Sequence, residues 1–89
     1  MARKLSLTHD ADKFLARLDG KQFKQVVRRI FSLATDTTPA DAIKMKGSSY
    51  YRVDQGEYRI VYSFDNDTVY ILMVGKRNDD EVYVQARQK

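Results

Sequence analysis

Hydrophobic residues near the start of the chain change their spacing at Thr8, from a period of two to the period of an α-helix. Leu5 and Leu7 alternate with polar residues, which predicts a short strand over residues 3–7. Thr8 can cap the helix that follows, because its side-chain oxygen can accept a hydrogen bond from a backbone amide of the first turn. The apolar residues of that helix recur at helical spacing: Ala11, Phe14, Leu15 and Leu18.

A second amphipathic helix is predicted over residues 21–34, after a break at Asp19-Gly20. Its apolar stripe consists of Phe23, Val26, Val27, Ile30, Phe31 and Ala34. We expect the two apolar stripes to pack against each other as a helical hairpin and then onto a sheet.

From Tyr50 onward, apolar residues alternate with polar ones, which is typical of strands buried on one face. Before that point, residues 35–41 predict a loop, and residues 42–49 are irregular, with Met45 as the expected buried residue. Two strands are predicted on either side of a turn at Gln55-Gly56, with Tyr51, Val53, Tyr58, Ile60, Tyr62 and Phe64 on one face. A third strand over residues 68–75 is apolar on both faces, so we expect it in the interior of the sheet.

These elements predict a single α+β domain over residues 1–89. It has an N-terminal strand, a helical hairpin, an antiparallel three-stranded meander that completes a small sheet, and a short C-terminal helix within residues 78–88. The helices cover one face of the sheet, so the other face is left for a partner or a substrate.

Two arginines are predicted to lie side by side on that other face. With Gln55 and Gly56 as the central residues of the hairpin, Arg52 lies directly opposite Arg59. Like charges in this position are destabilising, and an anion above them would relieve the repulsion. Arginine is well suited to bidentate contacts with phosphate. Alternatively, both are solvated surface residues neutralised by acidic neighbours.

The composition agrees with a polyanionic partner without proving one. The chain has 16 Lys and Arg against 12 Asp and Glu, a net charge of +4, and a pI of about 9.4. It has no cysteine and one histidine, His9, which excludes disulfides and leaves too few ligands for a zinc site. We expect no metal and no cofactor. No apolar run could span a membrane and no signal-peptide core is present, so we expect a cytoplasmic protein.

The order of several short motifs resembles the RelE-type toxins of the RelE/ParE superfamily. They are Thr8 to Leu15, Lys44-Met45-Lys46-Gly47, Tyr58-Arg59, Gly75-Lys76-Arg77 and Tyr83, and the resemblance covers nearly the whole chain. It implies a toxin of a type II toxin-antitoxin system that cuts mRNA in the ribosomal A site without a metal. It also implies three partners: a cognate antitoxin, the ribosome with its mRNA, and operator DNA bound only through the antitoxin complex.

The resemblance also implies roles for individual residues. Arg59 would contact the scissile phosphate, Arg52 would position a phosphate or base, and Arg77 would stabilise or protonate the leaving group. Tyr83 would stack on a base, although its alternative role is packing in the last helix. The further substrate-binding residues would be Lys44, Lys46, Lys76 and Asp54.

Asp54 departs from the family pattern, because typical members have a basic residue at this position. It could accept the proton of the 2′-hydroxyl group, as could Lys46 or Lys44, or it could neutralise Arg52 or Arg59. We favour the neutralising role, because the pKa of an aspartate beside two arginines should be lowered.

The sequence leaves two other functions open. ParE-type relatives share the fold, lack the basic catalytic set, and poison DNA gyrase by binding it. The chain could also be an inactive toxin homologue that acts with an antitoxin as a co-repressor. The basic set favours the ribonuclease, and Asp54 keeps the alternatives open.

Overall fold

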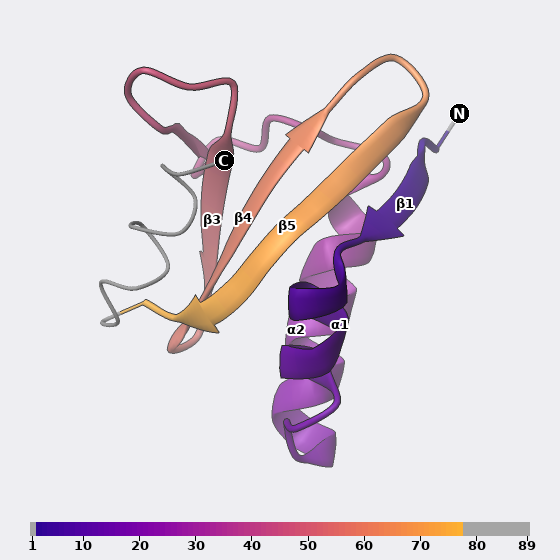
Figure 1. Cartoon of the computed structure of the whole chain (residues 1–89), viewed down its shortest axis with the longest axis vertical. Coiled ribbons are helices and arrows are strands. Elements are labelled where there is room, and N and C mark those ends of the chain that lie inside the picture. The colour runs from indigo at the N-terminus through magenta and orange to yellow at the C-terminus, as the bar shows by residue number, and fades with distance from the viewer. Residues whose placement is uncertain (1, 78–89) are drawn as a thin grey trace.

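The structure is a computed structural model that describes residues 2–77. Its elements, in chain order, are β1 (Lys4–Leu7), α1 (His9–Leu15), α2 (Gly20–Leu33), β2 (Ile43–Lys44), β3 (Tyr51–Gln55), β4 (Tyr58–Phe64) and β5 (Thr68–Lys76). Both helices lie on one side of the sheet, and the predicted α+β class is confirmed (Figure 1). The C-terminal helix predicted within residues 78–88 lies outside the described residues.

The strands form one sheet in the order β1-β5-β4-β3-β2. β1 pairs with β5 in parallel, and the other neighbours pair antiparallel. β5 therefore lies inside the sheet, as its apolar faces predicted. β2 was not predicted, because its two residues are too few to show a period.

Local hydrogen bonds define where the helices begin, and they agree with the sequence. The Thr8 hydroxyl oxygen accepts from the amide of Ala11 at 3.2 Å. The same hydroxyl donates to the carbonyl oxygen of Leu72 at 2.6 Å, which ties the start of α1 to β5. Asp19 caps α2 by accepting from the amide of Gln22 at 3.1 Å. These caps satisfy amides that have no partner within the helix.

The main core lies between the helices and one face of the sheet, which we call the helix side. Its fully buried residues include Ala11, Val26, Leu33, Val53, Ile60, Tyr62, Val69 and Ile71. The Tyr62 hydroxyl group donates to the Thr37 carbonyl oxygen at 2.6 Å, so the one polar atom of this ring has a partner. Burial raises the pKa of Tyr62 to about 12. The predicted core face of β3 and β4 is confirmed.

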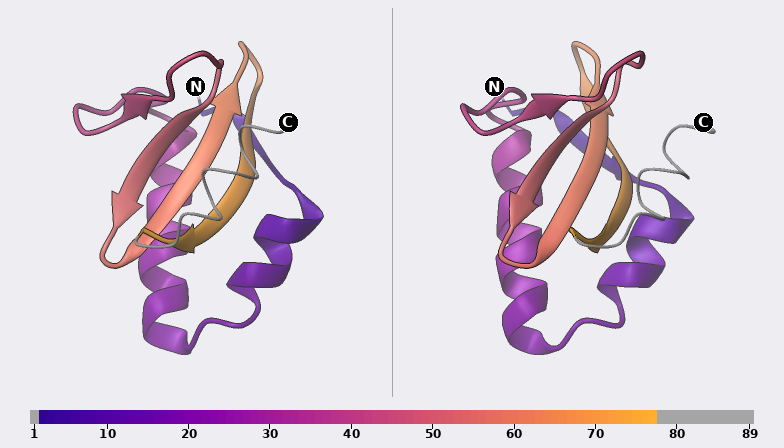
Figure 2. Two further views of the ribbon diagram at one scale, coloured as in Figure 1. Left: turned by 60° about the vertical axis from the view of Figure 1, so that its left-hand side comes forward. Right: turned by 90° about the vertical axis from the view of Figure 1, so that its left-hand side faces the viewer.

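Part of the predicted apolar stripe of α2 is not buried. Phe23 is 42% exposed and Phe31 is 61% exposed, whereas Val26, Ile30 and Leu33 face the sheet and are buried. The two helices stand apart and approach each other only toward the loop that joins them, so they do not bury these rings between them (Figure 2). The apolar stripe of α2 is wider than the contact that the sheet offers.

The predicted register of the β3–β4 hairpin is wrong. Arg52 lies opposite Val61, and Arg59 lies opposite Asp54. Gln55 and Tyr58 are the last pair before the turn, so the central residues of the turn are Gly56 and Glu57. Gly56, with a φ of 60°, is therefore the first and not the second of them. The observed pairing brings opposite charges together where the predicted one faced like charges, and opposite charges stabilise a cross-strand pair. The shift still leaves both arginines on the face opposite the helices, which we call the arginine side.

Candidate functional site

Two rows of paired residues cross the arginine side of the sheet. One row runs from Asp54 through Arg59 to Gly75. The other runs from Ile43 through Arg52 and Val61 to Met73. Because residues opposite each other in adjacent strands share a face, Arg52 and Arg59 emerge from neighbouring strands on this side. Gly75 adds no side chain beside Arg59.

Asp54 and Arg59 form an ion pair. The Arg59 Nε donates to Asp54 Oδ1 at 2.8 Å, and its Nη2 donates to Oδ2 at 3.4 Å. The Arg59 side chain is only 12% exposed, and that of Asp54 is 35% exposed. A largely buried guanidinium next to a carboxylate is held in one orientation, because two of its donors are engaged.

Three arginines act on the Asp54 carboxylate. Its pKa is lowered, first by the hydrogen bond from Arg59 and then by the positive charges of Arg59, Arg52 and Arg77, while partial burial opposes the shift. The carboxylate is therefore negative at neutral pH and offsets part of the local charge. Arg77 is exposed and follows β5, and its amide donates to the Glu57 carbonyl oxygen at 2.9 Å.

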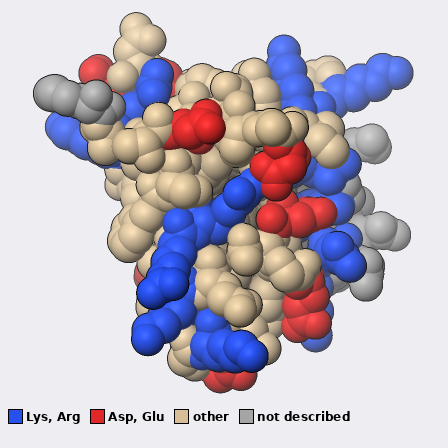
Figure 3. Space-filling model, turned by 180° about the vertical axis from the view of Figure 1, so that it is seen from behind, with Lys and Arg blue, Asp and Glu red and all other residues tan. Residues whose placement is uncertain are grey.

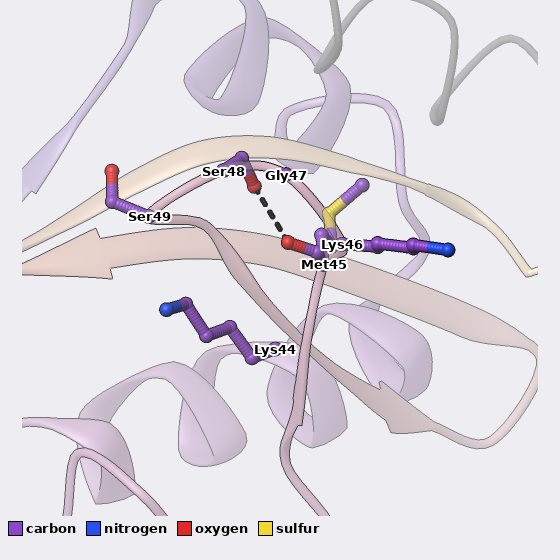
Figure 4. A pocket seen from close by; sticks show the side chains of 6 residues that line it. All are labelled: Lys44, Met45, Lys46, Gly47, Ser48 and Ser49. Carbon is purple, nitrogen blue, oxygen red and sulfur yellow. Dashed lines mark hydrogen bonds between the residues drawn. The ribbon is translucent and has the colours of Figure 1, made fainter.

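The lysines predicted to bind substrate do not all lie on the arginine side. Lys44 pairs with Tyr51, whose ring packs into the main core, so Lys44 leaves the strand toward the helix side. Lys76 pairs with Tyr58, also a core residue, and leaves its strand in the same sense. Lys46 follows β2 in the loop, and its side chain extends away from that of Lys44 (Figure 4).

The loop after β2 borders an open hollow of about 550 Å³, lined by Lys44, Met45, Lys46, Gly47, Ser48 and Ser49. The loop is closed by hydrogen bonds between its own residues, including the bond from the Ser48 hydroxyl group to the Met45 carbonyl oxygen at 3.0 Å (Figure 4). Gly47 has a φ of 76°, a conformation that favours glycine at this turn. Two lysines beside a hydroxyl-rich loop form a surface suited to anions.

A small apolar cluster on the arginine side was missed by the sequence reasoning, apart from its buried residue Met45. Met45, Val61 and Met73 are buried together, and Tyr50 and Leu72 pack against them. A signal was available, because Tyr50 lies two residues before Arg52 and alternation puts both on the same side. Tyr83, the one tyrosine predicted for the site, lies outside the described residues.

The helix side carries a second exposed feature, an apolar groove. It encloses about 270 Å³ and is lined by Leu5, Leu7, Asp12, Leu15, Ala16, Phe23, Val27, Ile30 and Phe31. Seen from behind, Lys and Arg side chains gather on the lower part of the molecule, where the helices lie (Figure 3). On α2, Lys24 and Arg28 each follow a groove residue by one position and are exposed. The groove is therefore mainly apolar, with Asp12 as its one charged lining residue, and the face that carries α2 also has exposed basic side chains.

Two features are absent from the part of the chain that the structure describes. Between residues 2 and 77, no group of three or more His, Cys, Asp or Glu side chains is arranged to hold a metal ion. No helix in the same stretch is long and apolar enough to cross a membrane.

Comparisons with solved structures show a shared fold. A double arginine-to-alanine mutant of the E. coli toxin RelE, in the free state, matches with a TM-score of 0.82 and 24% identity, over 99% of this chain and 97% of that one. A chain of the archaeal RelE-RelB complex from Pyrococcus horikoshii matches with a TM-score of 0.76 and 24% identity, over 86% and 97%. The chromosomal ParDE system from P. aeruginosa matches with a TM-score of 0.70 and 12% identity, over 84% and 96%.

Sequence comparison decides the family. No curated protein sequence matches the chain significantly. The family model of the ParE toxin of the type II toxin-antitoxin system parDE matches residues 5–81. This match spans most of the chain, and the fold is that of RelE and ParE toxins. The chain therefore belongs to the ParE toxin family and is a type II toxin of the RelE/ParE superfamily.

Proposed function

We propose that this toxin is a ribosome-dependent, metal-independent endoribonuclease that cuts mRNA in the ribosomal A site and thereby inhibits translation. The observation that carries the proposal is the gathering of Arg52, Arg59 and Arg77 around Asp54 on the arginine side. Cleavage of RNA through its 2′-hydroxyl group builds negative charge on the phosphorus centre. Fixed guanidinium groups stabilise such charge without reorganisation during the reaction.

The arginines would divide the work by position. Arg59, oriented by Asp54, would contact the scissile phosphate. Arg52, one strand away, would hold an adjacent phosphate or base. Arg77, the most exposed of the three, would stabilise or protonate the 5′-oxygen that leaves. Lys76 would add positive charge near the end of β5, and Tyr83 would stack on a base.

The proton of the 2′-hydroxyl group needs an acceptor. Of the three candidates, Asp54 is engaged by Arg59 and its pKa is lowered, which makes it a weak base. Lys44 leaves its strand on the helix side. These two observations argue against Asp54 and Lys44 as the acceptor. In the same step, the 2′-oxygen bonds to phosphorus and the bond from phosphorus to the 5′-oxygen breaks.

The experiment that tests this function compares the same message free and on translating ribosomes. Primer extension should detect cuts in the ribosome-bound message. EDTA, added at a concentration that leaves the ribosomes intact, should not change the rate of cleavage by the toxin. Free RNA should stay largely intact, because positioning by the ribosome supplies much of the rate. Rapid cutting of free RNA, or no cutting on ribosomes, would contradict the proposal.

A second candidate function is binding to DNA gyrase without enzymatic activity. Two observations favour it: the family model is that of ParE toxins, and Asp54 offsets charge beside Arg59, where RelE-type toxins have a basic residue. A gyrase supercoiling assay with the purified toxin distinguishes the two functions. Inhibition of supercoiling together with intact ribosome-bound message would support the ParE-type function. A toxin silent in both assays would support an inactive co-repressor.

The expected partner is an antitoxin, as for other toxins of the family, and two exposed surfaces of this chain could bind it. Several similar structures are complexes of RelE with RelB antitoxins. The basic arginine side and the sheet edges suit an acidic segment. The groove between α1, α2 and β1 suits an amphipathic helix with acidic flanks, because its lining is mainly apolar and the helices carry exposed basic side chains on the same part of the molecule. We therefore propose that the antitoxin contacts both sides of the sheet. We also propose that the toxin meets operator DNA only through the antitoxin, which binds the DNA.

A further inference from the structure

The arginine side presents an aromatic ring close to its cations. Tyr50 lies immediately before β3 and two residues before Arg52, so both side chains leave the chain on the same side, about 7 Å apart along the strand. The ring packs against Met45, Val61 and Met73 and is partly exposed. An aromatic ring supported from beneath and partly open is a surface on which a nucleobase can stack.

The backbone around Tyr50 is fixed. Its amide donates to the Ser48 hydroxyl oxygen at 3.1 Å, and its carbonyl oxygen accepts from the Met45 amide at 2.8 Å. The Ser48 amide donates to the Met45 carbonyl oxygen at 3.2 Å, which closes the turn. Because these bonds hold the loop, a base that stacks on Tyr50 would not first have to order it.

Positive charge lies on both sides of the ring along the chain. Lys46 precedes Tyr50 in the loop that borders the 550 Å³ hollow, and Arg52 follows it in β3. RNA alternates bases with phosphates, so an aromatic ring between two cations matches the spacing of chemistry along a single strand.

We propose that Tyr50 and Lys46 form a binding subsite for one nucleotide of single-stranded RNA, next to the arginine cluster. The Tyr50 ring stacks on the base, and the Lys46 ammonium group binds the phosphate on the side of the hollow. This inference rests on the proposed ribonuclease function, and it assigns a base-contacting residue that is separate from Tyr83.

Tyr70 provides a matched comparison on the same side of the sheet. It lies opposite Ser63, and it is 37% exposed. Its hydroxyl group donates to Asp65 Oδ2 at 2.8 Å, in a turn that also contains Asp67. Two carboxylates beside this ring repel phosphates, so a comparable exposed tyrosine should not bind RNA.

The test measures binding of an uncleavable 2′-O-methyl tetraribonucleotide to the full-length toxin by NMR titration, separately from cleavage. Tyr50→Ala should weaken binding by about 5- to 150-fold, the range expected for loss of one stacked base. Tyr50→Phe should bind like the wild type, because the ring supplies the stacking. Lys46→Ala should weaken binding and reduce its salt dependence. Tyr70→Ala should bind like the wild type.

Loss of packing must be distinguished from loss of stacking. Tyr50→Leu keeps an apolar side chain against the Met45 cluster but removes the aromatic ring, so it should stay folded and bind as weakly as Tyr50→Ala. Wild-type affinity in a folded Tyr50→Leu variant would overturn the subsite, as would absence of binding by the wild type. The proposed function fails by a different result, namely wild-type toxin that binds the tetranucleotide but leaves ribosome-bound message intact.

Discussion

The two faces of the same sheet have opposite chemistry, although neighbouring residues of one strand supply both. On β4, Ile60 is fully buried on the helix side, and the preceding residue, Arg59, faces the other side in an ion pair with Asp54. Strand alternation makes this possible, because each successive side chain points to the opposite face. Stability and the candidate chemistry are therefore placed on adjacent residues that do not share surroundings.

The faces also differ in what they leave incomplete. On the helix side, Phe23 and Phe31 remain exposed around an apolar groove, so the uncovered surface is hydrophobic. On the arginine side, the single carboxylate of Asp54 faces the positive charges of three arginines, so the uncovered surface is electropositive. A partner that covers the first surface gains by burying apolar area, whereas a ligand of the second must be anionic.

The largest expected effect is on the fold, from a change on the helix side. Ile60→Ala should lower the free energy of unfolding by about 2–5 kcal/mol, because it leaves a cavity in the centre of the core. Arg59→Ala, one residue away, should lower it far less. Urea denaturation followed by circular dichroism measures both. Equal losses for the two variants would show that the two faces are not separate in energy.

The arginine side should show the reverse pattern in activity. Arg59→Ala and Arg77→Ala should each reduce cleavage of ribosome-bound message by about 10²–10³-fold, the usual cost of one contact that stabilises transition-state charge. Both variants should keep the folded spectrum. Primer extension on a single message measures the rates. Near-native cleavage by both variants would remove this face as the active site.

A smaller effect is expected in the groove. Phe31→Glu should weaken antitoxin binding by about tenfold or more, because it places a carboxylate where an apolar and acid-flanked helix would pack. Without antitoxin, the variant should cleave ribosome-bound message and arrest growth as the wild type does. Gln25→Glu adds the same charge to α2 at an exposed residue that does not line the groove, and it serves as the control. Isothermal titration with the antitoxin compares them, and equal affinities would exclude the groove as a contact.

The smallest expected effect concerns the stability contributed by Asp54. Its pKa is lowered in the folded protein, so the ion pair stabilises the fold fully above the usual carboxyl pKa of about 4. That contribution is lost as the pH falls through the lowered pKa. Asp54→Asn should therefore cost up to about 1 kcal/mol at pH 7, and the difference from wild type should shrink toward pH 2. Denaturation at the two pH values measures it, and a difference that grows on acidification would contradict the assignment.

The same residue tests the proposed chemistry. Asp54→Lys should keep or raise cleavage, since it restores the basic residue of RelE-type toxins, and it should slightly destabilise the hairpin by adding a like charge. Asp54→Asn should still cleave if Asp54 only neutralises Arg59. An Asp54→Asn variant that binds ribosomes but no longer cleaves would instead identify Asp54 as the proton acceptor.

Much of the fold follows from local patterns. The helical spacing of Ala11 and Leu15, the cap at Thr8, and the alternation from Tyr51 onward predicted both helices, the longer strands and the core face correctly. Even the face of Arg52 and Arg59 was predicted despite a wrong register, because the observed pairing differs by an even number of residues. The proposed roles of the site residues stay predictions.

Other features needed the tertiary structure. A sequence does not state which partner residue a strand selects, and here the turn at Gly56 and the attraction between Asp54 and Arg59 accompany a register that alternation alone allowed but did not require. The parallel pairing of β1 with β5 joins residues more than 60 positions apart, which no local pattern encodes.

Burial likewise separates what the sequence determined from what the structure decided. The period of α2 determined that Phe23 and Phe31 lie on an apolar stripe, and the separation of the two helices decided that they stay exposed. The order of residues determined that Tyr50 and Arg52 share a side, and the fold of the loop decided that Met45 supports the ring. The physical reason is that side-chain periodicity is a property of one segment, whereas burial and charge pairing depend on which segments meet.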